Sequence, residues 1–156
     1  MRSTALADTI DALVATWRTA QIPETEVFDG LQPGEETSQT YIVVGVEDPW
    51  LVDQSIDAAT SEQTFPLLTY QVRDEQLTIR CVVVAWSGDN DLAPVRAAAV
   101  RALDGALEAL VEDITLGGVV LQIIGVSNIA LRQSYGVDGV VVNIPFTIEC
   151  QARLAP

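Results

Sequence analysis

The sequence predicts an α+β fold in which a mostly antiparallel sheet carries two main helices on one face. Two segments repeat apolar residues at helical spacing, and several others alternate apolar and polar residues with the period of a strand. The predicted order is α-β-β-α-β-β with long early loops, over residues 4–20, 41–46, 67–86, 92–111, 119–131 and 139–154. The chain length fits a single domain over residues 1–156.

Each predicted helix has one apolar face and a recognisable start. The first, residues 4–20, can be capped by Ser3 or Thr4. The second begins after Asp91, a natural N-cap, and runs to about Val111. Its many alanines permit close approach to a sheet, so both helices are expected to cover the same core.

The last two strands are expected to pair antiparallel because they follow each other along the chain. In residues 139–154 the even-numbered positions from Val140 to Ala152 are apolar, which predicts one buried face. Pro145 cannot donate to a ladder, so this strand is expected to be an edge or to bulge there. Gly125 predicts a bend or a bulge in the preceding strand.

The regions between these strands are less regular. Residues 47–65 show no clear period and are expected to form a long loop, a feature that is often functional. Residues 24–30 are expected as a short extended piece, and residues 132–138 as a connection. A hairpin turn is expected near Asp74 and Glu75 within residues 67–86.

Composition narrows the function. The chain has 8 basic and 22 acidic residues, a net charge of −14, so we expect it to repel DNA and anionic membranes. It contains no histidine, and all its basic residues are arginine. The usual general base at neutral pH, histidine metal ligands and lysine nucleophiles are therefore missing. We expect an intracellular protein with no enzymatic activity and no cofactor.

Cys81 and Cys150 each lie in an apolar alternating run. Two buried free thiols are one interpretation, because free cysteine packs as a small hydrophobic residue. A disulfide between paired strands is the other, and it would need close Cα atoms and an oxidising compartment.

The acidic clusters do not predict a catalytic or metal site. Asp89, Asn90 and Asp91 lack the alternating acids, central glycine and closing glutamate of a calcium loop, so helix capping explains them better. Other neighbouring carboxylates lie in polar loops, where solvation is the simpler explanation. We predict no catalytic, cofactor-binding or metal-binding residue.

Aromatic residues in loops are candidates for contacts. Trp50 follows Asp-Pro in the long loop and either docks on its own core or meets a partner, because tryptophan is enriched at interface hot spots. Tyr135 poses the same alternative. We predict a subunit or partner interface at Trp50, Leu51, Phe65 and Tyr135.

An ordered set of segments resembles the tail terminators, also called tail completion or minor tail proteins, of long-tailed phages. It covers nearly the whole chain. After an amphipathic N-terminal helix come Val27-Phe28-Asp29-Gly30, the strand 41–46, Arg80 to Asp89, the Ala-rich helix, Thr115 to Val119 and the closing Ile148 to Leu154.

The resemblance implies a structural virion protein. Such a protein would form a homo-oligomeric, hexameric ring that caps the head-proximal end of the tail tube. It would be assembled in the host cytoplasm, and its partners would be the major tail (tube) protein and the head–tail connector protein. DNA would only pass through the channel, and no membrane is involved. Acidic loop residues would then face the channel: Glu35, Glu36, Glu47 and Asp48.

Two alternatives remain open from sequence. One is a small acidic intracellular binding module, or another head–tail joining protein without enzymatic activity. The other is a hydrolase that uses carboxylates alone, which would need two buried acids facing each other in a cleft.

Overall fold

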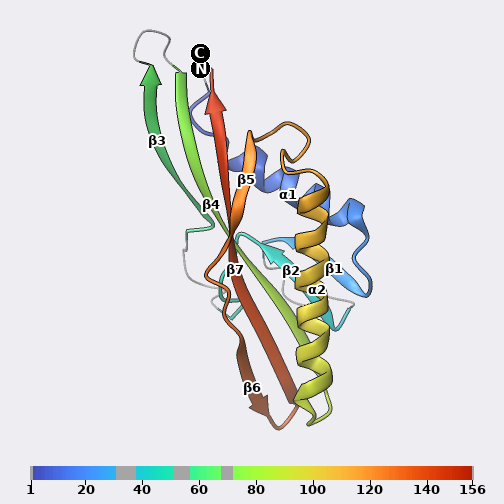
Figure 1. Ribbon diagram of the computed structural model, residues 1–156. Helices are drawn as coiled ribbons and strands as arrows, with labels where there is room; N and C mark the ends of the chain where they lie inside the picture. The colour runs from blue at the N-terminus through green and yellow to red at the C-terminus, as the bar shows by residue number, and fades with distance from the viewer. Residues whose placement is uncertain (1, 31–37, 51–56, 68–71, 156) are drawn as a thin grey trace.

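The computed structural model describes residues 2–30, 38–50, 57–67 and 72–155 (Figure 1). It is an α+β fold of two helices and a seven-stranded sheet. In chain order the elements are α1 (Leu6–Ala20), β1 (Thr25–Asp29), β2 (Thr40–Val44), β3 (Ala59–Leu67), β4 (Val72–Ser87), α2 (Leu92–Glu112), β5 (Gln122–Ser127), β6 (Arg132–Gly136) and β7 (Gly139–Leu154).

The predicted element order is only roughly matched, because a helix and four strands precede α2 and three strands follow it. The strand β3 lies in the predicted long loop, and β6 lies in the predicted connection. All five residues of β6 are exposed, so neither face of the strand packs on the core. The sequence of β6 therefore lacks the alternation of apolar and polar residues that marks a half-buried strand. The last two predicted strands do pair antiparallel, as β5 and β7, and β5 is shorter than predicted.

The sheet is built on the long antiparallel pair of β4 and β7, which runs from Arg73 opposite Leu154 to Ser87 opposite Val140. Beyond β4 lie β3 on its first half and β2 on its second half. Beyond β7 lie β5 and β6. Among the strands of the described residues only β1 and β2 pair in parallel, so the predicted mostly antiparallel sheet is confirmed.

Two predictions about turns and edges are wrong. Asp74 and Glu75 do not form a turn; they lie within β4, where Asp74 is opposite Arg153 and binds its guanidinium. Pro145 is not on an edge, because β7 has partners on both sides.

Pro145 is accommodated in a central strand by its position between two partners. Its carbonyl oxygen accepts from the amide of Ala130 at 3.2 Å. The N–H and C=O of one strand residue point to the same side, so the proline nitrogen faces the gap between β5 and β6. No ladder hydrogen bond to β4 is lost there.

Both helices pack on one face of the sheet, as predicted, and one large core cluster joins them to it (Figure 1). The even-numbered residues of β7 from Val140 to Leu154 are all buried in that cluster. Trp17 of α1 is fully buried, packs against Phe146 and donates from Nε1 to the carbonyl of Ala106 in α2 at 3.0 Å. The opposite face holds a smaller buried cluster of Tyr41, Val43, Val82 and Val84.

The two cysteines are free and buried. Cys150 lies opposite Leu77, four residues along β4 from Cys81. At roughly 3.3 Å per residue this exceeds the Cα separation that a disulfide allows. The interpretation as two buried thiols is confirmed.

The helix starts differ from each other. Asp91 caps α2 as predicted, accepting from the amide of Ala93 at 3.3 Å. At α1 the cap position is Ala5, whose side chain cannot cap, but Oγ1 of the preceding Thr4 accepts from the Leu6 amide at 3.2 Å. Glu75, distant in sequence, adds a second acceptor, which binds the Ala5 amide at 2.8 Å.

Candidate interaction site

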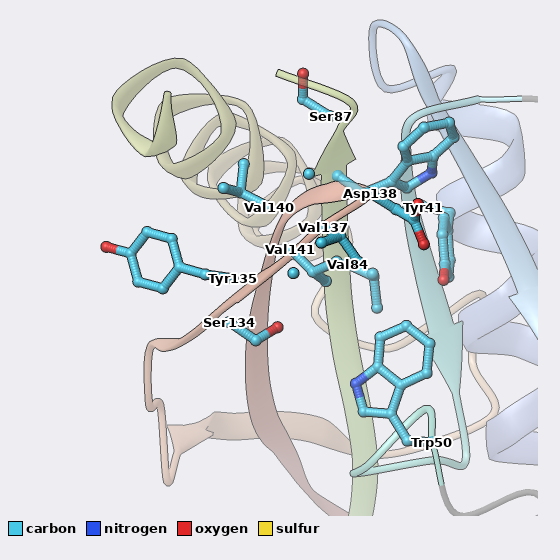
Figure 2. Close-up of a pocket in the computed structure, with 13 residues that line it drawn as sticks. Tyr41, Trp50, Val84, Ser87, Ser134, Tyr135, Val137, Asp138, Val140 and Val141 are labelled. Atoms are coloured by element: carbon cyan, nitrogen blue, oxygen red, sulfur yellow. The ribbon is translucent and has the colours of Figure 1, made fainter. Parts of the chain in front are cut away.

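A groove of about 510 Å³ lies on the face of the sheet opposite the helices. Aromatic side chains line it on one side and the hairpin of β6 and β7 on the other (Figure 2). In Figure 2, Trp50, Tyr41 and Val84 border the same space. The groove lining is mainly apolar, with a few polar groups, which suits binding of another molecule.

Trp50 is held at the rim of this groove. Its amide donates to Oδ1 of Asp48 at 3.0 Å, a local turn that sets the direction of the chain. Its side chain is 58% exposed, so it is not buried in the core of its own chain. Trp86, 41% exposed, lines the same groove from the end of β4. The two tryptophans leave a large apolar area open to solvent.

The other predicted contact residues are placed differently. Tyr135 lies in the hairpin that lines the groove, but its side chain points away from it, to the opposite side of the hairpin, and is 74% exposed (Figure 2). Phe65 is also exposed, in β3 on the other side of the sheet. Leu51 lies outside the described residues. The groove therefore brings together Trp50 and the β6–β7 hairpin, but not the side chains of Phe65 and Tyr135.

The predicted acidic channel residues are similarly divided. Glu47 forms an ion pair with Arg80, with 3.1 Å between Oε2 and Nη1. Asp48 accepts the hydrogen bond that orients Trp50. Glu35 and Glu36 lie outside the described residues. That these acids face a channel stays a prediction.

A second group of exposed apolar side chains lies in the segment from the end of α2 to the β6–β7 hairpin. Twelve large hydrophobic side chains are exposed among the described residues, and eight of them lie between Val111 and Val137. They are Val111, Ile114, Leu121, Ile124, Ile129, Leu131, Tyr135 and Val137. Between Asp113 and Glu149 the sequence has only two charged residues, Arg132 and Asp138. Exposed apolar side chains with so few charges between them in the sequence are candidates for contacts with a partner.

The most enclosed carboxylate in the described chain is Glu75, which is 1% exposed. It accepts from Ser61 Oγ at 2.6 Å, from the hydroxyl of Thr4 and from the Ala5 amide. Burial raises the pKa of Glu75, but the hydrogen bonds from Ser61, Thr4, Ala5 and Gln63 outweigh it and hold the pKa below 4.5. The carboxylate is thus an ionised structural link between α1, β3 and β4.

The two thiols are buried as well. Burial raises the pKa of Cys150 to about 11, and it raises that of Cys81 further, so neither thiol is a ready nucleophile. Within residues 2–30, 38–50, 57–67 and 72–155, no group of three or more metal-binding side chains comes together. In the same part of the chain, no helix has the length and apolar character needed to span a membrane.

The roles of three residues were not predicted from the sequence. Tyr41 and Trp86 line the groove, and Glu75 links α1 to the sheet. A signal was present for two of them. Alternate residues of a strand share a face, so Trp86 lies on the face of Val82 and Val84. By the same rule Glu75 lies on the face of buried Leu77, which places a carboxylate on the core face.

No protein-family model matches the sequence, and no curated protein matches it significantly.

Proposed function

We propose that this protein is a structural virion subunit that forms a ring at the head-proximal end of a phage tail tube. In this role it ends tail polymerisation and joins the tail to the head connector. The sequence resemblance to tail terminators supports the specific role. The geometry supports the more general one, a protein that acts through contacts and not through catalysis.

The observation that carries the general role is the exposed apolar surface between Val111 and Val137. The chain has a net charge of −14, but this stretch of its sequence carries almost no charged residues. Such a surface is costly in water unless a partner covers it. The acidity elsewhere is compatible with a DNA conduit, because a negative wall does not retain DNA.

The test is the length of tail tubes. Purified major tail protein polymerises alone or with this chain, and tubes are measured by negative-stain electron microscopy. We expect shorter tubes with a ring at one end. Tubes of unchanged length and with no bound chain would overturn the proposal.

A substitution of Trp50 tests whether the groove contributes to binding in this role. We expect Trp50→Ala to weaken binding to its assembly partner by about tenfold or more, as truncation of an interface tryptophan does. Stability should stay within about 0.5 kcal/mol, because the side chain is 58% exposed. Val100→Ala, on the exposed side of α2, is the matched control and should bind normally. Equal tube binding by both variants would remove the groove from the interface.

A second candidate is a binding module without ring symmetry. The groove lined by Tyr41, Trp50 and Trp86 favours it, since aromatic grooves with a few polar groups bind peptides and small molecules. Failure of tube binding, together with a discrete complex of one chain and one partner, would select this function instead.

A further inference from the structure

The strand β6 is the least protected element of the described chain. It pairs with β7 on one side, and Figure 1 shows no helix or strand on its other side. All five of its residues are exposed, and Val137 at the hairpin tip is fully exposed. Natural edge strands are usually blunted by charges, prolines or a covering element. Residues 132–136 contain one charge and no proline.

The direction of the backbone groups in β6 can be derived from the ladder. The carbonyl of Pro145 points toward the β5–β6 side, where it meets Ala130. The other odd-numbered residues of β7 then point the same way, toward their partners Arg132, Ser134 and Gly136. The N–H and C=O groups of Gln133 and Tyr135 therefore point outward, available to another strand.

The two charges near this edge have opposite signs and lie at opposite ends. Arg132 begins β6, and Asp138 lies in the turn just after it. Neither belongs to an ion pair within the part of the chain that is described. Cross-strand parity places Arg132 on the same sheet face as Val141 and Asn143, which is the groove face that Asp138 also borders (Figure 2).

We propose that β6 pairs antiparallel with β6 of a second copy of this chain, about a two-fold axis at Ser134, and so continues the sheet across a dimer. In this register Gln133 of one copy exchanges backbone hydrogen bonds with Tyr135 of the other. Each Arg132 lies beside the hairpin tip that carries the other copy's Asp138. The edge is thus complementary to itself in hydrogen bonding and in charge, as an isologous contact requires.

The negative charge of the chain favours contact with a second copy at the β6 edge over contact at the rest of the surface. Two chains of −14 repel each other over most of their surfaces. The repulsion is smallest where the surface carries no acidic residue, and that condition holds along β5 and β6, whose one charged residue is Arg132. The same reasoning disfavours the β1 strand as the docking surface, because it is flanked by exposed Glu24 and Asp29.

This inference stands apart from the tail-ring function. A ring is closed by head-to-tail contacts between two different surfaces, whereas the β6 contact is two-fold and joins one surface to itself. A dimer of the free chain and a ring on a tail tube can therefore be tested separately.

The first experiment is cross-linking at the axis. Ser134 would face its own copy in a non-hydrogen-bonded pair, with Cα atoms about 4.5 Å apart, within disulfide range. We expect Ser134→Cys to form linked dimers rapidly under mild oxidation, without interference from the buried Cys81 and Cys150. The control is Glu62→Cys, which is exposed on β3. Linking of Ser134→Cys no faster than Glu62→Cys would overturn the proposal.

The second experiment is a charge exchange, read as the dimer dissociation constant from sedimentation equilibrium. Arg132→Asp and Asp138→Arg should each weaken dimerisation about tenfold, because each sets like charges together across the axis. The double variant should restore the wild-type constant. A wild-type chain that stays monomeric at its highest soluble concentration, or a double variant weaker than both single ones, would refute the two-fold contact. Normal tube capping alongside either result would leave the tail function intact.

Discussion

The two outer sides of the sheet differ in the side chains that surround their edge strands. On the side beyond β4, polar groups tie β3 to its surroundings: Gln63 Nε2 donates to the carbonyl of Ser3 at 2.7 Å, and Arg73 Nη1 donates to Gln63 Oε1 at 3.0 Å. On the side beyond β7, β5 and β6 carry one charged residue and exposed apolar side chains. We call these the tethered side and the open side.

The same contrast holds for backbone groups. On the tethered side, the Val27 carbonyl of β1 accepts two hydrogen bonds from Arg18, at 3.1 and 3.0 Å. That acceptor is therefore not free to recruit another strand. On the open side the outward groups of Gln133 and Tyr135 have no such cover. The difference teaches that edge protection in this protein is selective, as the proposed association at one side requires.

The largest effect we predict is beside the turn of the β6–β7 hairpin on the open side. Gly139 has a φ of +127°, and a Cβ there would lie 2.0 Å from the Ser87 carbonyl oxygen. Gly139→Ala should destabilise the fold by about 3 kcal/mol or more, from overpacking and backbone strain together. Gly125→Ala is the matched control on the same side, since a Cβ there has open space. Similar urea midpoints for the two variants would contradict this contrast.

The next largest effect concerns the tethered side. Glu75→Ala should cost about 3 kcal/mol, because the Ala5 amide, Ser61 and Thr4 lose their acceptor in a buried place. The neighbouring Gln76 is exposed, so Gln76→Ala should change the free energy of unfolding by less than about 0.5 kcal/mol. Chemical denaturation measures both. Comparable losses would show that Glu75 is not the link between α1 and the sheet.

The pH dependence of the free energy of unfolding also tests the role of ionised Glu75. The pKa of Glu75 is lowered in the folded chain, so its stabilising contribution is complete above the unfolded value near 4.5. The contribution is lost as the pH falls below 4.5 through the lower folded pKa. Wild-type stability should therefore fall more steeply in this window than that of Glu75→Gln. Parallel curves from pH 5 downward would assign the acid sensitivity to other carboxyls, such as Asp74 and Asp113, whose pKa values are also lowered by hydrogen bonding.

The smallest effect is on the open side itself. Ile124 sits at the bulge of β5 and is 50% exposed, whereas its neighbour Ile123 packs against the core. Ile124→Ser should change stability by less than about 0.5 kcal/mol, while Ile123→Ser should cost about 1–2 kcal/mol. Thermal or urea unfolding of the pair checks this. If Ile124→Ser were the more damaging change, the open side would belong to the core and not to a contact surface.

Much of the fold was predictable where a pattern repeats. The alternation of β7 assigned its core face correctly, and Asp91 marked the start of α2. The bulge expected at Gly125 was found between Ile123 and Gly125. These features depend on side-chain periodicity and on local hydrogen bonds, which neighbouring residues specify.

The candidate site was only partly predictable. Trp50 was identified, but its groove partners Tyr41 and Trp86 come from different strands, and only strand pairing brings them together. Tyr135 was identified without its direction, which depends on the register of β6 against β7. Nothing in the sequence marked β6 as a strand, because a strand exposed on both faces has no buried period.

By itself, the sequence determined the class of fold, the buried faces of the long strands, the acidic charge and the absence of histidine and lysine. Only the tertiary structure decided which strands became edges, where Pro145 could be tolerated and what Glu75 caps. The physical reason is the range of the interactions. Periodicity and local capping act between residues a few positions apart. Strand pairing joins Arg73 to Leu154, and a side-chain hydrogen bond joins Glu75 to the Ala5 amide, and no local pattern records either contact.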